Sequence, residues 1–300
     1  MKLKGYLFGL TSSISYGLIP LFIIPLKNVN FSMDTTLFYR FFFSAFMLGG
    51  YLVIKRKSLQ IEKKHIGILL LLGLFYGISS DSLFIAYDYL SAGIASTLLF
   101  IYPLIVAIIM AIFFKERLTL ASIMAILCTI AGVILLSFKN GEFNLNTIGL
   151  GIVFVSALGY ALYIITVNQS NVRNLNGMTL TFYSFCITTL YYASKLIIGK
   201  ESFAIPSIEI GLNIVVFAFV TTIVSSLALV YAIKYIGSTP TSILGAFEPV
   251  VAVAISVLLF HEYFSINLAF GIGLIITGVT LNIIGRATKK QVVKQKSDNS

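Results

Sequence analysis

The stretch IYPLIVAIIMAIFFKERLT at residues 101–119 and the stretch FEPVVAVAISVLLFHEYFS at residues 247–265 share one plan. In each, the third residue is proline, the sixteenth is glutamate, and the residues between them are almost all apolar. Apolar segments use few residue types, so chance identity between two of them is high. A proline and a glutamate at matching positions are harder to attribute to chance. The sequence therefore indicates an internal duplication, with these two stretches as corresponding parts.

The duplication extends over most of the chain. A shift of 146 residues aligns 66–137 with 212–283 without a gap, and a shift of 144 aligns the segments before them. The matched pairs are Ser79-Ser80 with Ser225-Ser226, Ala86 with Ala232, Tyr89 with Tyr235, Ser96 with Ser242, Gly132-Val133 with Gly278-Val279, Gly5 with Gly149, Ser12 with Ser156, Tyr16 with Tyr160, and Phe38-Tyr39 with Phe182-Tyr183. We therefore expect two repeats, at 1–138 and 147–286.

The composition is that of a membrane protein. Of the 300 residues, 58% are hydrophobic and 11% are charged, and the mean hydropathy is +0.98; soluble domains have about 25% charged residues. The apolar runs are continuous and long enough to cross about 30 Å of hydrocarbon as helices, and they do not alternate as barrel strands do. We predict an all-α membrane protein with ten transmembrane helices at 5–26, 34–54, 66–88, 93–114, 119–137, 147–168, 177–198, 209–235, 239–260 and 265–286.

The basic residues indicate how these helices are oriented. Of the 21 Lys and Arg residues, 16 fall on the side of the N-terminus, four on the other side, and Arg40 lies within a helix. This bias predicts a multi-pass protein of the cell (inner or plasma) membrane with both termini in the cytoplasm. The basic segment 287–300 is predicted to be a disordered cytoplasmic tail. The net charge of +10 is therefore explained by topology, and no nucleic-acid partner is expected.

The ten predicted helices divide into five per repeat. Because five is an odd number, the second repeat is expected to enter the membrane from the side opposite to the first. Inverted repeats of this kind are typical of secondary transporters, in which two halves rock around a site at their interface. The sequence therefore favours a transporter that works by alternating access. The expected partners are a small-molecule substrate, the lipid bilayer and a coupling proton or ion, and the protein is expected to be a monomer or a homodimer.

The two stretches also resemble a known repeat. Tyr102-Pro103 and Glu248-Pro249, the segments Lys115-Glu116-Arg117-Leu118-Thr119 and His261-Glu262-Tyr263-Phe264-Ser265, and the later Gly-Val pairs are similar to the EamA repeat of the drug/metabolite transporter superfamily. The resemblance covers residues 5–286. It implies a ten-helix permease, not an enzyme, and often an exporter of amino acids or related small molecules.

Two charged residues inside the membrane are candidates for the site, because a charge there costs about 2.5–3.5 kcal/mol. Arg40 is either a clamp for a carboxylate or one half of an ion pair between helices. Asp81 lies at a similar depth and is either the partner of Arg40 or a carboxylate that couples transport to protons. Their repeat mates, Ser184 and Leu227, are uncharged. This asymmetry favours a role in binding or gating for Arg40.

Further candidates lie near helix-breaking prolines. Glu248 immediately precedes Pro249. It either holds an ammonium group, facing its repeat mate Tyr102 across the local two-fold axis, or has a packing role as part of a Glu-Pro pair common in the repeat. The tyrosines Tyr16, Tyr160 and Tyr163 either line the cavity or pack as ordinary aromatic residues. The helix breaks are predicted at Pro20, Pro103 and Pro249.

Several classes of site are not expected. The sequence has no Walker, Gly-x-Gly-x-x-Gly or His-Glu-x-x-His pattern, and its two histidines lie in separate loops. We therefore expect no metal, no cofactor, no catalytic residues and no ATP-driven step. The leading hypothesis for the substrate is an amino acid or a related compound with amine and carboxylate groups. The alternative is efflux of cationic or lipophilic toxic compounds, with Arg40 merely structural.

Overall fold

The structure is a computed structural model that describes residues 2–90, 92–116, 120–137 and 146–260, with eight positions between 266 and 278. The described part of the chain is helical and contains no strand. Its elements are α1 (Lys2–Gly17), α2 (Ile19–Asn28), α3 (Met33–Ile54), α4 (Lys63–Ala86), α5 (Ala92–Leu99), α6 (Tyr102–Phe114), α7 (Leu120–Ser137), α8 (Thr147–Gln169), η1 (Asn171–Asn174), α9 (Gly177–Gly199), α10 (Ile208–Phe217), η2 (Ala218–Val224), α11 (Ser225–Ile236), α12 (Ser238–Leu244) and α13 (Phe247–Phe260).

Six helical segments of the described chain are long and apolar enough to cross a membrane. They are Lys2–Asn28, Met33–Ile54, Lys63–Ala86, Thr147–Gln169, Ile208–Ile236 and Ser238–Leu259. The prediction of a multi-pass helical membrane protein is therefore confirmed, whereas the count of ten spans stays a prediction. The tenth predicted span, 265–286, falls largely outside the described residues, and the predicted tail 287–300 falls wholly outside them.

Three of the predicted spans are each built from two helices. The breaks lie between α1 and α2, between α5 and α6, and between α12 and α13. Pro20 and Pro103 are each the second residue of the new helix, and Pro249 is the third residue of α13. Proline has no N–H, so it fits the first turn of a helix, where that group has no partner within the helix. Each proline therefore lies where one helix has ended and the next begins.

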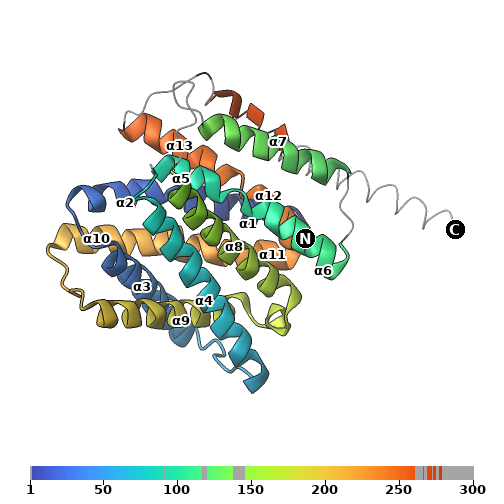
Figure 1. The fold of residues 1–300 in the computed structure, drawn as a ribbon. Helices are drawn as coiled ribbons and strands as arrows, with labels where there is room; N and C mark the ends of the chain where they lie inside the picture. The colour runs from blue at the N-terminus through green and yellow to red at the C-terminus, as the bar shows by residue number, and fades with distance from the viewer. Residues whose placement is uncertain are drawn as a thin grey trace.

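The first helix of each repeat packs mainly against the other repeat. The most extensive helix–helix contacts of the described chain join α1 to α11 and α8 to α4. These two pairings are related by the duplication, because α8 corresponds to α1 and α11 corresponds to the C-terminal part of α4. Figure 1 shows α8 lying along α4 in the middle of the bundle. The two halves are therefore interlocked rather than placed side by side.

Matching polar contacts occur at the two related interfaces. The hydroxyl oxygens of Ser12 and Ser225 lie 3.4 Å apart, and those of their mates Ser156 and Ser79 also lie 3.4 Å apart. Small residues at such positions let helix backbones approach closely in a membrane. The duplication seen in the sequence is thus repeated in the packing.

A second layer of helices covers one side of this core. α3 packs against its repeat mate α9, and α9 also packs against α4. In Figure 1, α3 and α9 lie at the lower side of the bundle, whereas α7 lies at the opposite edge beside α5. The apolar core lies between these layers and includes Phe41, Tyr76, Tyr160 and Phe185.

Candidate functional site

Repeat mates meet one another at the centre of the molecule. The rings of Tyr16 and Tyr160 stack with 5.8 Å between centroids, and the hydroxyl of Tyr102 donates to Glu248 Oε1 over 3.5 Å. Tyr102 and Tyr160 join the two pairs through an edge-to-face contact of 4.6 Å. Residues related by a two-fold axis contact each other only near that axis. These four residues therefore lie at the interface of the two repeats, where transporters of this architecture bind substrate.

The helix breaks place Tyr102 and Glu248 in this position. Tyr102 is the first residue of α6, and Glu248 is the second residue of α13. Between α12 and α13, a Cβ atom added to Gly245 would overlap the hydroxyl of Tyr102. Glycine at this position therefore makes room for the tyrosine to reach Glu248. Irregular backbone at membrane depth is tolerated where it is buried in protein or lines a cavity.

The cavity at this centre is small. It has a volume of about 10 Å³ and is bordered by Tyr16, Pro20, Ser96 and Glu248, together with apolar residues of α1, α2, α4, α5 and α13. A volume of this size holds at most one water molecule. In this conformation the centre is closed, and a substrate needs the surrounding helices to move apart.

Arg40 is fully buried in α3, with no exposed surface. Its Nε donates to the hydroxyl of Thr222 over 2.6 Å, its Nη2 lies 3.5 Å from the carbonyl oxygen of Thr221, and its Nη1 has no partner in the structure. The guanidinium carbon lies 4.6 Å from the ring centroid of Phe217 and 5.8 Å from that of Tyr16. The cation is thus held by aromatic faces and threonines, without a carboxylate among the described residues.

The threonines that contact Arg40 belong to the π-helical segment η2. The wider turn of a π-helix shifts the register of side chains and carbonyls, and such segments are frequent at functional sites. The hydroxyl of Ser44 donates to the carbonyl oxygen of Ala218, at the start of the same segment, over 3.1 Å. The segment corresponds to residues 72–78 of α4, which are α-helical. The π-helical segment and the Arg40 charge that it contacts are therefore both absent from the corresponding positions of the other repeat.

Of the two alternatives for Asp81, the pair with Arg40 is not formed in this conformation. Lys195 lies 2.6 Å from Asp81 and 2.7 Å from Asp34, and Tyr191 donates to Asp81 over 3.1 Å. The physical reason is that α9 packs against both α3 and α4, so its lysine reaches both aspartates. Equal depth in the membrane did not place the two side chains on facing sides of their helices.

Tyr163 packs against a tyrosine of α4. It has no exposed surface, its hydroxyl has no partner in the structure, and its ring lies 5.1 Å from that of Tyr76. The Tyr76 hydroxyl in turn lies 2.8 Å from that of Ser226. Tyr163, like Tyr102 and Tyr160, does not border the central cavity.

Sequence reasoning missed Thr222, Phe217, Tyr76 and Lys195. Threonine, phenylalanine and tyrosine are common in apolar helices, so nothing in the pattern distinguished the first three. Lys195 carried a signal, because it lies three residues before the end of a predicted span, at the same end as both aspartates. Lys195 is one of the four basic residues on the side opposite to the N-terminus, and that count does not distinguish a lysine in a loop from one paired with Asp34 and Asp81.

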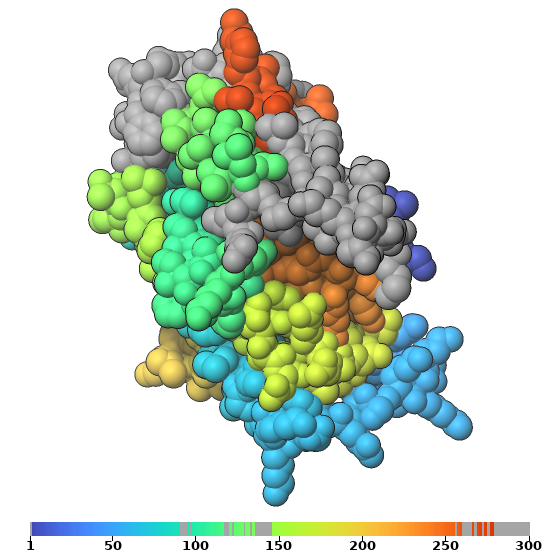
Figure 2. Space-filling view, turned by 90° about the vertical axis from the view of Figure 1, so that its right-hand side faces the viewer, coloured from blue at the N-terminus to red at the C-terminus, as the bar shows by residue number. Residues whose placement is uncertain are grey.

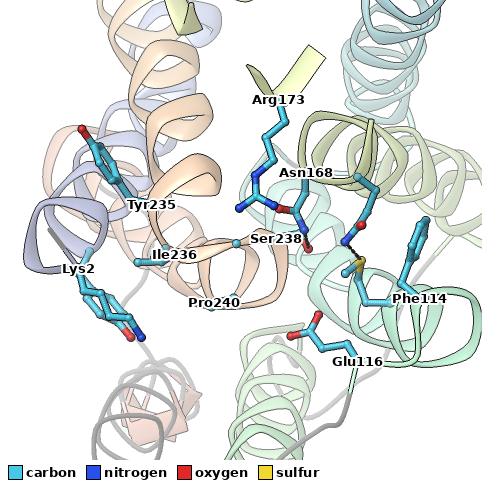
Figure 3. Close-up of a pocket in the computed structure, with 13 residues that line it drawn as sticks. Lys2, Phe114, Glu116, Asn168, Arg173, Tyr235, Ile236, Ser238 and Pro240 are labelled. Carbon is cyan, nitrogen blue, oxygen red and sulfur yellow. Dashed lines mark hydrogen bonds between the residues drawn. The ribbon is translucent and has the colours of Figure 1, made fainter. Parts of the chain in front are cut away.

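A larger cavity opens on the face that carries the N-terminus. We call it the vestibule; it has a volume of about 500 Å³ and lies between the ends of α1, α6, α8, η1 and α11 and the start of α12. Figure 2 shows the chain near residue 240 (orange) recessed between α6 (green) and the segment near residue 170 (yellow-green). Polar side chains border it, including Lys2, Glu116, Asn168 and Arg173 (Figure 3).

Within the described ranges, no group of three or more His, Cys, Asp or Glu side chains is placed to hold a metal ion. The two cysteines, Cys128 and Cys186, are unpaired and partly buried.

Comparisons with known proteins agree with this architecture. A protein of known crystal structure, 18% identical, superposes with a TM-score of 0.78 over 96% of this chain and 99% of its own, which shows the fold alone. An uncharacterized transporter of Archaeoglobus fulgidus is 25% identical over 270 residues, 89% of this chain and 91% of its own. The uncharacterized transporter YxxF of Bacillus subtilis is 23% identical over 245 residues, 81% and 78% of the two chains.

The sequence profile of the EamA-like transporter family matches residues 3–138 and again residues 147–284. The two matches coincide with the two repeats seen in the sequence and in the packing. Together with the membrane-spanning helices, they establish that this chain is a membrane transporter and belongs to the EamA-like transporter family.

Proposed function

We propose that the protein is a secondary permease that exports small metabolites carrying both an amine and a carboxylate, such as amino acids. The observation that supports this substrate class is a pair of buried, opposite charges that do not meet. Arg40 has no exposed surface and Glu248 is 7% exposed, and neither forms an ion pair with another described residue.

Tyr16 connects the two charges. Its ring lies 5.8 Å from the Arg40 guanidinium, and it borders the same small cavity as Glu248. A guanidinium binds a carboxylate through two parallel hydrogen bonds, and a carboxylate binds an ammonium group. A zwitterion placed against Tyr16 would therefore pair with both charges at once. In the closed site, neither Arg40 nor Glu248 has an oppositely charged partner among the described residues.

Alternating access is the mechanism that the repeats support. With five helices each, the repeats have opposite orientation in the membrane, and their central residues face each other across the local axis. Opening the helices toward one face and then the other would expose Arg40 and Glu248 to each side in turn. We place the protein in the cell membrane with both termini in the cytoplasm. Asp81 and Glu248 are the candidate groups for a coupling proton or ion.

Uptake and efflux in proteoliposomes test this proposal. A panel of labelled amino acids is loaded on either side under proton and sodium gradients, and we expect gradient-dependent exchange of at least one of them.

Glu248→Gln removes the charge with little change in shape and is expected to raise the KM for that compound about ten- to a hundredfold, the effect of losing one charged hydrogen bond. Glu209→Gln, at an exposed position in the first turn of α10, is the matched control. Absence of transport under every gradient would count against the proposed function, and equal transport by Glu248→Gln would remove the site assignment alone.

Efflux of cationic or lipophilic toxic compounds is the second candidate. The observation that favours it is the set of aromatic rings around one buried acid, because Tyr16, Tyr102 and Tyr160 surround Glu248 without a facing cation. An expressing strain grown on cationic dyes distinguishes the two functions. If resistance depends on Glu248 but not on Arg40, the second candidate holds.

A further inference from the structure

We infer that the vestibule is a loading site, distinct from the central site, that takes the carboxylate of the substrate at Arg173 before the substrate passes to the centre. The inference rests on the proposed function, because it assumes a substrate with amine and carboxylate groups. It goes beyond that function by assigning a second site, on the face that the Lys and Arg bias places in the cytoplasm.

The vestibule has the size and polarity of a site for a small polar molecule. Its volume of about 500 Å³ lies within the range of ligand pockets. It is lined by elements of both repeats, since α1 and α6 belong to the first and α8, η1 and α12 to the second. Any relative movement of the repeats would therefore change its shape.

Arg173 supplies an available cation at one wall. Its side chain is exposed and borders the vestibule, and no ion pair links it to a carboxylate in the part of the chain that the structure describes. Lys2 lies at another wall. Their repeat mates, Val29 and Asn146, are uncharged. The basic character of this cavity is therefore specific to one face of the molecule and is not imposed by the repeat.

Two hydrogen-bond acceptors also border the vestibule, Asn168 beside Arg173 and Glu116 on the opposite side. Asn168 is only 7% exposed, its Nδ2 donates to the hydroxyl of Ser238 over 3.1 Å, and its Oδ1 has no partner in the structure. Glu116 contributes a carboxylate that accepts from the hydroxyl of Thr239 over 2.9 Å. In Figure 3, Arg173 and Asn168 point toward Ser238, and Glu116 approaches from the opposite side. A buried acceptor without a partner is costly, so a donor such as an ammonium group would be favoured there.

The same helices connect the vestibule to the centre. On α8, Asn168 follows Tyr160 by eight residues, and on α6, Met110 follows Tyr102 by eight residues. Eight residues of helix span about 12 Å. α12 packs against both α6 and α8, so the three elements lie together between the vestibule and the centre. A molecule released from Arg173 would thus meet Tyr102 and Tyr160 after a short passage.

Thiol chemistry tests the charge of the vestibule without a known substrate. In the full chain, purified in detergent and carrying Cys128→Ala and Cys186→Ala, Gln169→Cys places a thiol at an exposed position on the vestibule wall. The probes are two methanethiosulfonate reagents of similar size, one with a sulfonate and one with a trimethylammonium group. Arg173→Gln is expected to lower the ratio of their rates, sulfonate over ammonium, by about threefold, the effect of one charge several ångströms away. Arg56→Gln, at an exposed position that does not border the vestibule, is expected to leave the ratio unchanged.

Transport then tests whether the site loads substrate. For the amino acid that the wild type moves, Arg173→Gln should raise the KM on the side of the vestibule about tenfold, with the maximal rate and the KM on the other side little changed. Arg173→Lys should recover most of the affinity. An unchanged reagent ratio, an equal change with Arg56→Gln, or an unchanged KM would each overturn the inference. If the wild type moves no amino acid, the proposed function fails, while the reagent ratio still decides whether the vestibule attracts anions.

Discussion

At the scale of single residues, Arg40 makes fewer hydrogen bonds than a buried guanidinium can form. A guanidinium has five N–H donors, yet the structure provides two nitrogen contacts, one of them long, and leaves Nη1 without a partner. Burying an ion in this way costs several kcal/mol that hydrogen bonds and ring contacts repay only in part. Because burial of Arg40 lowers stability, its presence in α3 is better explained by a role in substrate binding than by a role in holding α3 in place.

Arg40→Met tests this interpretation. Methionine fills a similar volume with an unbranched apolar side chain, and replacing buried ions with apolar residues is often neutral or stabilising. We expect the melting temperature in detergent to be unchanged or raised, while transport of carboxylate-bearing substrates falls more than about tenfold. Thermal unfolding and proteoliposome transport on the same preparation provide the measurements. A large drop in melting temperature with transport retained would show that Arg40 is structural.

At the scale of helices, Lys195 joins three elements. Its ammonium group lies within 2.7 Å of Asp34 on α3 and of Asp81 on α4, while the lysine itself belongs to α9. The side chains are 32%, 22% and 13% exposed, respectively, for Lys195, Asp34 and Asp81. Partial burial makes this network stronger than a surface pair. It therefore fixes α3 and α4 to the helix between them.

Lys195→Met is expected to lower the free energy of unfolding by about 2 kcal/mol, because it leaves two partly buried carboxylates without a cation. Adding Asp34→Asn and Asp81→Asn should restore most of this loss, since the repulsion between the carboxylates is then removed. Lys200→Met, at an exposed position just beyond the same helix, is the control. Unfolding curves in mixed micelles measure all of these variants. Failure of the triple variant to recover would contradict the network.

Paired glycines provide a second test at this scale. A Cβ at Gly5 would lie 2.6 Å from Ile236 Cγ2, and one at its mate Gly149 would lie 2.8 Å from Leu90 Cγ. The contacted residues are themselves repeat mates, so the two interfaces are the same contact made twice.

Gly5→Ala and Gly149→Ala should therefore each cost about 1–2 kcal/mol from overpacking. Gly151→Ala, on the same helix as Gly149 but with nothing within 4 Å of its added Cβ, should be neutral or slightly stabilising. The free energy of unfolding in mixed micelles is the measurement. A clear difference between the two mates would mean that the interfaces are not equivalent in solution.

The sequence predicted the helices and the family well and the site only in part. Apolar runs and matched prolines are local features, so six of the ten predicted spans, the duplication and the residues beside each proline could be read directly. The direction in which a side chain points around its helix depends on packing, so the sequence could not decide whether Arg40 contacts Asp81 or, as the structure has it, Thr222. The π-helical turn of η2 has no distinguishing composition, so nothing indicated it before the structure.

At the scale of the whole molecule, the distribution of basic residues predicts the topology. The loop at 55–62 belongs to the basic side, and the loop at 200–207 belongs to the other side. In the chain without native cysteines, Ser58→Cys and Ser202→Cys both place thiols at exposed positions. A membrane-impermeant thiol reagent added to intact cells should label Ser202→Cys and should label Ser58→Cys only after lysis. The reverse pattern would place the vestibule on the outside and would change the direction assigned to loading.

The interlocked helices have a consequence for biosynthesis. Ser12 on α1 and its partner Ser225 on α11 are separated by 213 residues. A ribosome adds about 5–20 residues per second, so α1 exists for about 10–40 s before the surface that it packs against has been translated. During that interval its glycine and serine face has only lipid or the insertion machinery to contact, and the first half of the chain must wait for the second.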